Sequence, residues 1–169
     1  TLLRCCNLLE IPTAGVVRYA GTALADVAPR PHRRQVAMVF QRPVTFPGSV
    51  LDNLRAADHE LTRGDAGALL DRVGLPGDKL DQDADRLSGG EAQRMTIARA
   101  LATSPTVLLA DECTSSLDHD AKHRIEELVG DLAADGLEVI WVTHELAQAE
   151  RLAGRTLTMA NGNVTAETV

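Results

Sequence analysis

The chain has 169 residues, 44% hydrophobic and 24% charged, with a formal net charge of −7, a composition typical of an ordinary globular domain. The acidic balance argues against a basic nucleic-acid-binding surface, and no apolar run is long enough to cross a bilayer. Three cysteines without a C-x-x-C pair give no disulfide framework, which indicates a reducing compartment.

The first quarter of the chain carries strand signals separated by a loop signal. Residues 15–19 are predicted to form a strand, and residues 27–34 a basic loop punctuated by prolines. The apolar segment 35–41 predicts a second strand, which ends at Gln41. Gln41 is therefore expected where a buried strand leaves the sheet.

Helix signals dominate the middle of the chain. Residues 65–73 carry apolar side chains at helical spacing and end before Gly74, whereas residues 80–86 form a polar, acidic approach to the next helix. Residues 91–102 are rich in good helix formers, and the following turn residues 103–105 should stop that helix.

The start of this predicted helix has an unusual combination of residues. Ser88 and Glu91 have the spacing of a capping box, while Gly89 and Gly90 leave the amides of the first turn uncovered. Free amides at the positive end of a helix can hold a phosphate group. The capping box alone favours an ordinary capped helix over a phosphate-binding site.

Two acidic residues follow the next strand signal. Residues 107–110 form a short apolar run typical of a buried strand in a parallel sheet. Asp111 and Glu112 come directly after it, at the end of a strand where α/β proteins bind ligands. They are candidates for metal and water chemistry, with a pair of solvated loop acids as the alternative.

The last third of the chain completes an α/β pattern. An amphipathic helix is predicted over 121–134, a strand over 138–143 ending at His144, and a short helix with an apolar stripe over 146–152. Residues 156–165 predict a hairpin around Asn161-Gly162.

Five features of the sequence, taken together, resemble the nucleotide-binding domain of ABC-type ATPases in order and spacing. They are Gln41, the segment 87–94, the Asp111-Glu112 pair, the Ser-Ser-Leu-Asp segment 115–118, and His144. The resemblance implies a P-loop NTPase fold, a RecA-like core sheet with an inserted ABC helical subdomain. It implies a partial core over 1–48, a helical subdomain with the signature motif over 49–103, and a core region with the Walker B acids, D-loop and switch histidine over 104–169.

The same resemblance implies ATP and Mg²⁺ as cofactors and gives each site residue a role. Glu112 would orient the attacking water or accept its proton, and Asp111 would hold Mg²⁺. Gln41 would sense metal and water, and His144 would contact the γ-phosphate. Cys113 stands where the family usually has proline, which should loosen the exit from the strand, and its thiol is expected to be buried rather than reactive.

Family members pair two ATPase domains head to tail, so the signature motif would serve the nucleotide of the partner domain. Asp118 would then steady the seam between the domains. The residues expected to contact the partner's nucleotide are Ser88, Gly89, Gly90, Glu91 and Gln93.

One element of the family pattern does not occur in these residues. No stretch matches G-x-x-x-x-G-K-[ST], the phosphate-binding loop, and residues 1–9 resemble the helix that directly follows it. The chain is therefore expected to be incomplete at its N-terminus, and unstable and inactive on its own.

The function implied for the full-length protein is the ATP-hydrolysing subunit of an ABC transporter. It would be cytoplasmic and bound peripherally to the inner face of the membrane through permease subunits, with no nucleic-acid partner. Two alternatives remain: a non-transport ABC ATPase of translation or DNA repair, and a catalytically inactive remnant. The transported solute is not indicated by the sequence.

Overall fold

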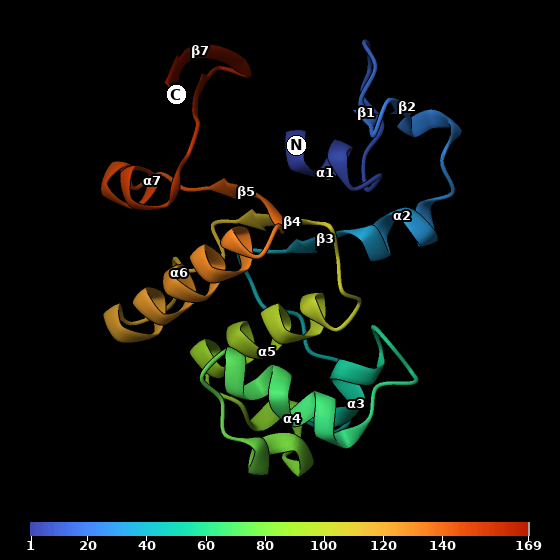
Figure 1. The fold of residues 1–169 in the computed structure, drawn as a ribbon, viewed down its shortest axis with the longest axis vertical. Helices are drawn as coiled ribbons and strands as arrows, with labels where there is room; N and C mark the ends of the chain where they lie inside the picture. The colour runs from blue at the N-terminus through green and yellow to red at the C-terminus, as the bar shows by residue number, and fades with distance from the viewer. Residues whose placement is uncertain (169) are drawn as a thin grey trace.

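A parallel three-stranded sheet lies across the middle of the molecule in the computed structural model, which describes residues 1–168 (Figure 1). Its order is β3 (Val36–Val39), β4 (Val107–Asp111) and β5 (Glu138–Val142). The β4 residues 107–110 are buried, as their continuous apolar run predicts. The α/β class with a parallel sheet is therefore confirmed.

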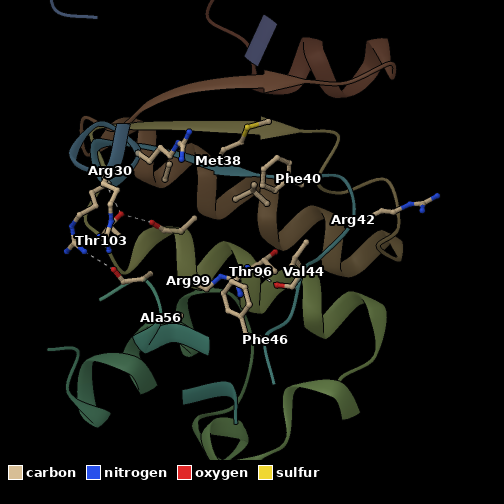
Figure 2. A pocket seen from close by; sticks show the side chains of 16 residues that line it. Arg30, Met38, Phe40, Arg42, Val44, Phe46, Ala56, Thr96, Arg99 and Thr103 are labelled. Carbon is tan, nitrogen blue, oxygen red and sulfur yellow. Dashed lines mark hydrogen bonds between the residues drawn. The ribbon is translucent and has the colours of Figure 1, made fainter. Parts of the chain in front are cut away.

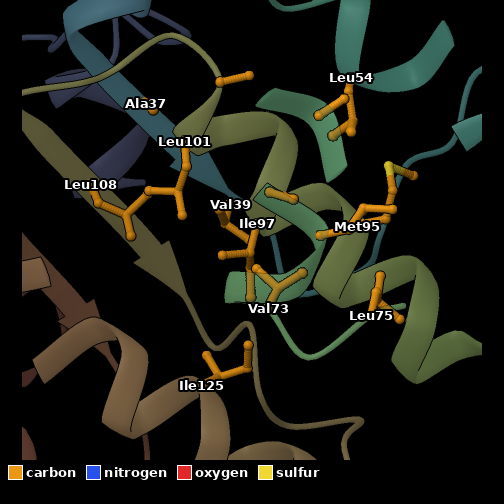
Figure 3. Packing of buried hydrophobic residues seen from close by; sticks show 14 of the residues in the cluster. Ala37, Val39, Leu54, Val73, Leu75, Met95, Ile97, Leu101, Leu108 and Ile125 are labelled. Atoms are coloured by element: carbon orange, nitrogen blue, oxygen red, sulfur yellow. The ribbon is translucent and has the colours of Figure 1, made fainter. Parts of the chain in front are cut away.

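The two faces of β4 contribute to two different hydrophobic clusters. Leu109 packs with Leu3 of the short helix α1 (Leu2–Cys6), whereas Leu108 belongs to the larger cluster that the helices share. Figure 3 shows side chains of the sheet, such as Val39, gathered with those of the helices, such as Ile97. Side chains alternate between faces along a strand, so one apolar run fills both clusters.

Three helices form a layer below the sheet in Figure 1: α3 (Val50–Arg55), α4 (Arg63–Arg72) and α5 (Gly89–Leu101). Helices α4 and α5 match their predicted positions within two residues, whereas α3 was not predicted. Between α4 and α5 the chain forms the 3₁₀ turns η2 (Gly77–Asp81) and η3 (Ala84–Arg86). These helices share the larger hydrophobic cluster with the sheet, so β4 and α5 hold each other in place.

The predicted loop over 27–34 is wrong, because the segment contains the helix α2 (Pro29–Gln35). Pro29 occupies the first turn, where a missing amide costs no hydrogen bond and the fixed φ suits a helix. Three basic residues lie in the last turn, where they complement the negative end of the helix dipole. Pro29 and Pro31 were interpreted as residues that prevent a helix, whereas they lie in the first turn of one.

The remaining elements flank the sheet. They are the hairpin β1 (Arg18–Tyr19) and β2 (Thr22–Ala23), the turn η1 (Leu24–Asp26), the helices α6 (His119–Ala134) and α7 (Leu146–Leu152), and the hairpin β6 (Thr156–Ala160) and β7 (Asn163–Thr168). The strand predicted over 15–19 shrinks to the two residues of β1. The C-terminal hairpin is confirmed, with positive φ angles of 51° and 79° at Asn161 and Gly162.

Helix α7 exists where the sequence predicts it, but its buried face differs. Leu146, the first member of the predicted apolar stripe, is 80% exposed, whereas Gln148 is only 2% exposed. A polar side chain therefore anchors this helix. Across residues 1–168, none of the helices combines the length and the apolar character that a membrane span requires.

Candidate functional site

The three side chains expected to act in catalysis meet where the parallel strands end. Gln41 follows β3, Glu112 follows β4 and His144 follows β5. The Gln41 amide donates a hydrogen bond of 3.1 Å to Glu112 Oε2, and His144 Nδ1 lies 3.3 Å from the same oxygen. The carboxyl ends of parallel strands share one edge, which brings residues far apart in sequence to one carboxylate.

The backbone at Glu112 is held in a conformation that non-glycine residues seldom adopt. Its φ is +46°, and its amide donates a 3.1 Å hydrogen bond to the carbonyl of Val142 at the end of β5. Strain of this kind persists only when the surrounding structure enforces it, and it concentrates at functional sites. The side chain is 29% exposed and so remains open to solvent next to His144.

Asp111 is the last residue of β4 and is partly buried. Its carboxylate suits a hard cation such as Mg²⁺, which prefers oxygen ligands and keeps several of its waters. Among residues 1–168 no group of three or more His, Cys, Asp or Glu side chains forms a ready metal site. Asp111 is therefore a single oxygen donor of the kind that Mg²⁺ prefers, at the end of β4 beside Glu112.

Residues 87–94, called the signature segment below, contain the start of α5, and Ser88 is the N-cap of this helix. The Ser88 hydroxyl accepts from the Glu91 amide at 3.3 Å, and Glu91 Oε2 accepts from the Ser88 amide at 2.9 Å. A Cβ added at Gly89 would meet nothing within 4 Å, whereas at Gly90 it would touch Leu117 at 3.4 Å. The capping box is confirmed, and the surface above Gly89 is open.

The Glu91 carboxylate is occupied on both oxygens. Its Oε1 lies 2.7 Å from Lys79 Nζ, while Oε2 caps the helix. The Lys79 hydrogen bond and the Ser88 amide together lower the pKa of Glu91 from 4.5 to about 2. This side chain stabilises the shape of the signature segment within its own chain.

The lowered pKa makes the stability contribution of Glu91 dependent on pH. A carboxyl group whose pKa falls on folding stabilises the protein above pH 4.5, and this contribution disappears as the pH falls toward about 2. We expect Glu91→Gln to lower the melting temperature at neutral pH and to have almost no effect near pH 2. Thermal unfolding at both pH values measures this, with Glu60→Gln as the control because the Glu60 side chain is 81% exposed. An equal loss at both pH values would contradict the ionic contribution.

Gln93 lies away from the exposed start of α5. It is fully buried, and its amide donates a 3.0 Å hydrogen bond to the carbonyl of Phe40, the residue before Gln41. Its Oε1 has no hydrogen-bond partner among the described residues. The side chain therefore joins the signature helix to the end of β3.

Asp118 and Cys113 have structural surroundings of their own. Asp118 is the N-cap of α6, where its carboxylate accepts from the Ala121 amide at 2.9 Å. Cys113 is 1% exposed, and burial raises the pKa of its thiol to about 12. The thiol is therefore neutral and inert, in agreement with the sequence-based expectation.

A cleft of about 680 Å³ lies between the sheet and the helical layer and carries five arginines (Figure 2). Its apolar part includes Phe40, Val44 and Phe46, which are 41%, 50% and 45% exposed. The arginines are Arg30, Arg33, Arg34, Arg42 and Arg99.

The arginines of the cleft are only partly neutralised. Arg99 lies 4.6 Å from the centre of the Phe46 ring and donates to the Val44 carbonyl at 2.7 Å. Arg34 lies 3.6 Å from Asp58, the one ion pair recorded for the five arginines within residues 1–168. The cleft therefore combines exposed apolar surface with excess positive charge. Its signal in the sequence was the basic segment 27–34, which did not by itself indicate a binding surface.

The chain is similar in sequence to ATP-binding proteins of transporters. The family model described as "ABC transporter" matches residues 1–115. The phosphate import ATP-binding protein PstB 2 of Mycobacterium tuberculosis is 41% identical over 186 residues, covering 99% of this chain and 66% of the relative. The glutamine transport ATP-binding protein GlnQ of Escherichia coli is 38% identical over 174 residues, covering 97% of this chain and 72% of the relative.

A solved structure shares the fold. The cbiO1 protein of Clostridium perfringens, part of the transporter complex cbiONQ, superimposes with a TM-score of 0.82 at 24% identity, covering 98% of this chain and 70% of that one. This chain therefore spans about two thirds of the length of these relatives.

Proposed function

Because this chain belongs to the ABC transporter family, in its ATP-binding branch, we propose that the complete protein that carries it hydrolyses ATP to drive solute transport. One observation carries the proposal: the side chains of Gln41 and His144 both meet the Oε2 atom of Glu112 where the strands end. The phosphate-binding loop that this chemistry also needs does not occur in residues 1–169, so the activity is proposed for the complete protein.

Glu112 is the residue that activates water in this proposal. Water attacks the terminal phosphorus as the bond to the leaving ADP oxygen breaks, and Glu112 accepts the proton that the water loses. His144 donates a hydrogen bond to the transferred phosphoryl group, and Gln41 holds Glu112 in place through its amide. Bound ATP and Mg²⁺ would supply the phosphoryl group and neutralise part of its charge. Asp111 would hold the metal, with the Gln41 side-chain oxygen as a second donor.

The signature segment serves a second ATPase domain in a head-to-tail dimer. The open surface above Gly89, with the Gly89 and Gly90 amides ahead of the capped Glu91 amide, supports phosphate binding from outside the chain. Residues 49–103 act as the helical subdomain, and Asp118 lies at the dimer seam. Glu91 and Gln93 contribute indirectly, since one braces the cap and the other joins α5 to the strand before Gln41.

Permease subunits dock in the arginine-lined cleft, which places the ATPase on the cytoplasmic face of the membrane. Exposed aromatic and aliphatic side chains beside excess positive charge suit an amphipathic helix that carries carboxylates. One relative is named for import of phosphate and another for transport of glutamine, and import of a small solute is the direction proposed here. The chemistry of the cleft does not depend on which solute is carried.

Purification of the complete protein from its own membranes tests the proposed function. We expect magnesium-dependent phosphate release from ATP and co-purification of an integral membrane permease. Co-purification with ribosomes or DNA in place of a permease would favour a non-transport ATPase of the same family. Absence of turnover in the complete protein would favour an inactive remnant.

A charge reversal in the cleft tests permease docking separately. Arg42→Glu is expected to reduce the co-purified permease about tenfold, since a like charge facing the helix's carboxylates costs well over 1 kcal/mol. Arg42 is exposed, so the fold should tolerate the change. The matched control is Arg72→Glu on α4, an exposed arginine outside the cleft. Equal permease recovery with the two variants would contradict docking in this cleft.

A further inference from the structure

One buried glutamine joins three separate parts of the molecule. The Gln148 amide nitrogen donates to Thr114 Oγ1 at 3.0 Å and to Glu126 Oε1 at 2.7 Å. Its oxygen accepts from the Trp141 indole nitrogen at 3.2 Å. Both amide protons and the carbonyl are therefore used, within a side chain that is 2% exposed. The network joins α7 to α6, to β5 and to the segment that follows β4.

Glu126 sets the orientation of this amide. It is 6% exposed and accepts two further hydrogen bonds from Arg151, at 3.1 Å and 3.0 Å. Burial acts to raise the pKa of Glu126, but the hydrogen bonds from Arg151 and Gln148 outweigh it and lower the pKa. An ionised carboxylate only accepts hydrogen bonds, so the NH₂ group of Gln148 must face Glu126 and its oxygen must face the indole.

The network joins the two segments that carry Glu112 and His144. Thr114 lies two residues after Glu112, while Trp141 and Gln148 lie on either side of His144 in sequence. Lys122, one turn before Glu126 on α6, also contacts Glu145, the residue after His144. The same face of α6 therefore holds the segment that follows His144 in the chain.

From this arrangement we propose that Gln148 is a positioning residue, which sets His144 against Glu112 by joining the two segments that carry them. Packing alone does not explain a glutamine here, because an apolar side chain would fill the space without the cost of burying a polar group. A fully satisfied polar network fixes one geometry more strictly than apolar contacts do. The inference rests on the proposed ATPase function and names a residue that does not itself touch the nucleotide.

The test replaces Gln148 by methionine, which keeps the length of the side chain and removes its hydrogen bonds. In the complete protein we expect Gln148→Met to lower kcat by about 10- to 100-fold and to weaken binding of ATP more than binding of ADP. His144 faces the terminal phosphate, so a displaced histidine affects ATP selectively. Exchanging the two groups in Glu126→Gln/Gln148→Glu keeps a carboxylate next to an amide and should restore much of the lost activity.

The control is Leu152→Met, a conservative change on the same helix outside the network, which should match the unmodified protein. Trp141, the one tryptophan of residues 1–169, gives a second readout, because loss of its hydrogen bond should shift its fluorescence emission in Gln148→Met and not in Leu152→Met. Unchanged kcat in Gln148→Met, or an equal loss of ATP and ADP binding, would overturn the positioning role.

Failure of the proposed function has a different signature. If the unmodified protein and Leu152→Met both lack turnover, the ATPase proposal fails. The position of His144 is then read from its imidazole NMR resonances, which should shift in Gln148→Met and stay in place in Leu152→Met. Resonances that stay unshifted in Gln148→Met would overturn the inference in that case as well.

Discussion

Glu112→Gln is expected to reduce ATP turnover by about 100- to 10,000-fold while ATP binding is kept. The amide has nearly the same shape as the carboxylate and can still accept the hydrogen bond from Gln41, which is 3.1 Å long in the structure. It cannot accept a proton from water, so the nucleotide-bound state should accumulate. The loss should therefore appear in kcat and leave the dissociation constant of ATP almost unchanged.

Steady-state phosphate release and equilibrium ATP binding measure the two parts of this prediction. Glu127→Gln is a matched control, because Glu127 is a glutamate on α6 whose side chain is 63% exposed and lies one helical turn from His123, which it contacts. Turnover that stays within about twofold in Glu112→Gln would remove Glu112 from the role of proton acceptor.

Leu108→Ala is expected to have the largest effect on folding, a loss of about 2–5 kcal/mol in the free energy of unfolding. Leu108 is 1% exposed in the central strand and contacts the cluster shared by the sheet and the helices (Figure 3). Removing its branched end leaves a cavity that the surrounding elements cannot fill completely. The same strand ends at Asp111, directly before Glu112, so turnover should fall along with stability.

Urea-induced unfolding of the complete protein measures the loss. Leu157→Ala on β6 serves as the control, since Leu157 is 49% exposed and its truncation should change stability by about 0.5 kcal/mol or less. If both variants unfold at the same urea concentration, the packing of β4 between its two clusters does not hold the protein together as described.

Elements with a strong local signal were predictable from the sequence. The apolar run of β4 and the capping box of α5 each contain their own information, because burial and cap hydrogen bonds are decided within a few residues. Helix α2 was not predicted because proline usually ends a helix, and only the position of the helix start shows that these prolines are compatible with it. Helix α3 was not predicted because its 6 residues are too few to show a clear helical periodicity.

The site divides in the same way. Gln41, Glu112 and His144 could be placed at strand ends from the sequence, since parallel strands end at a common edge. The buried contacts of Gln93 and Gln148 could not, because a single glutamine has no periodic or motif signal and its partners lie far away in the chain. The exposure of Leu146 follows from the same polar anchor, which hydrophobic periodicity cannot detect.

The positive φ of Glu112 places chemistry and stability in competition at one position. A glycine would adopt the observed φ of +46° without strain, whereas a glutamate there costs about 1–3 kcal/mol. Selection for stability alone would therefore favour Glu112→Gly, which removes the carboxylate. Efforts to make the protein more heat-resistant by consensus or backbone-relaxing substitutions should leave this residue untouched, because the change that relieves the strain also abolishes the proposed reaction.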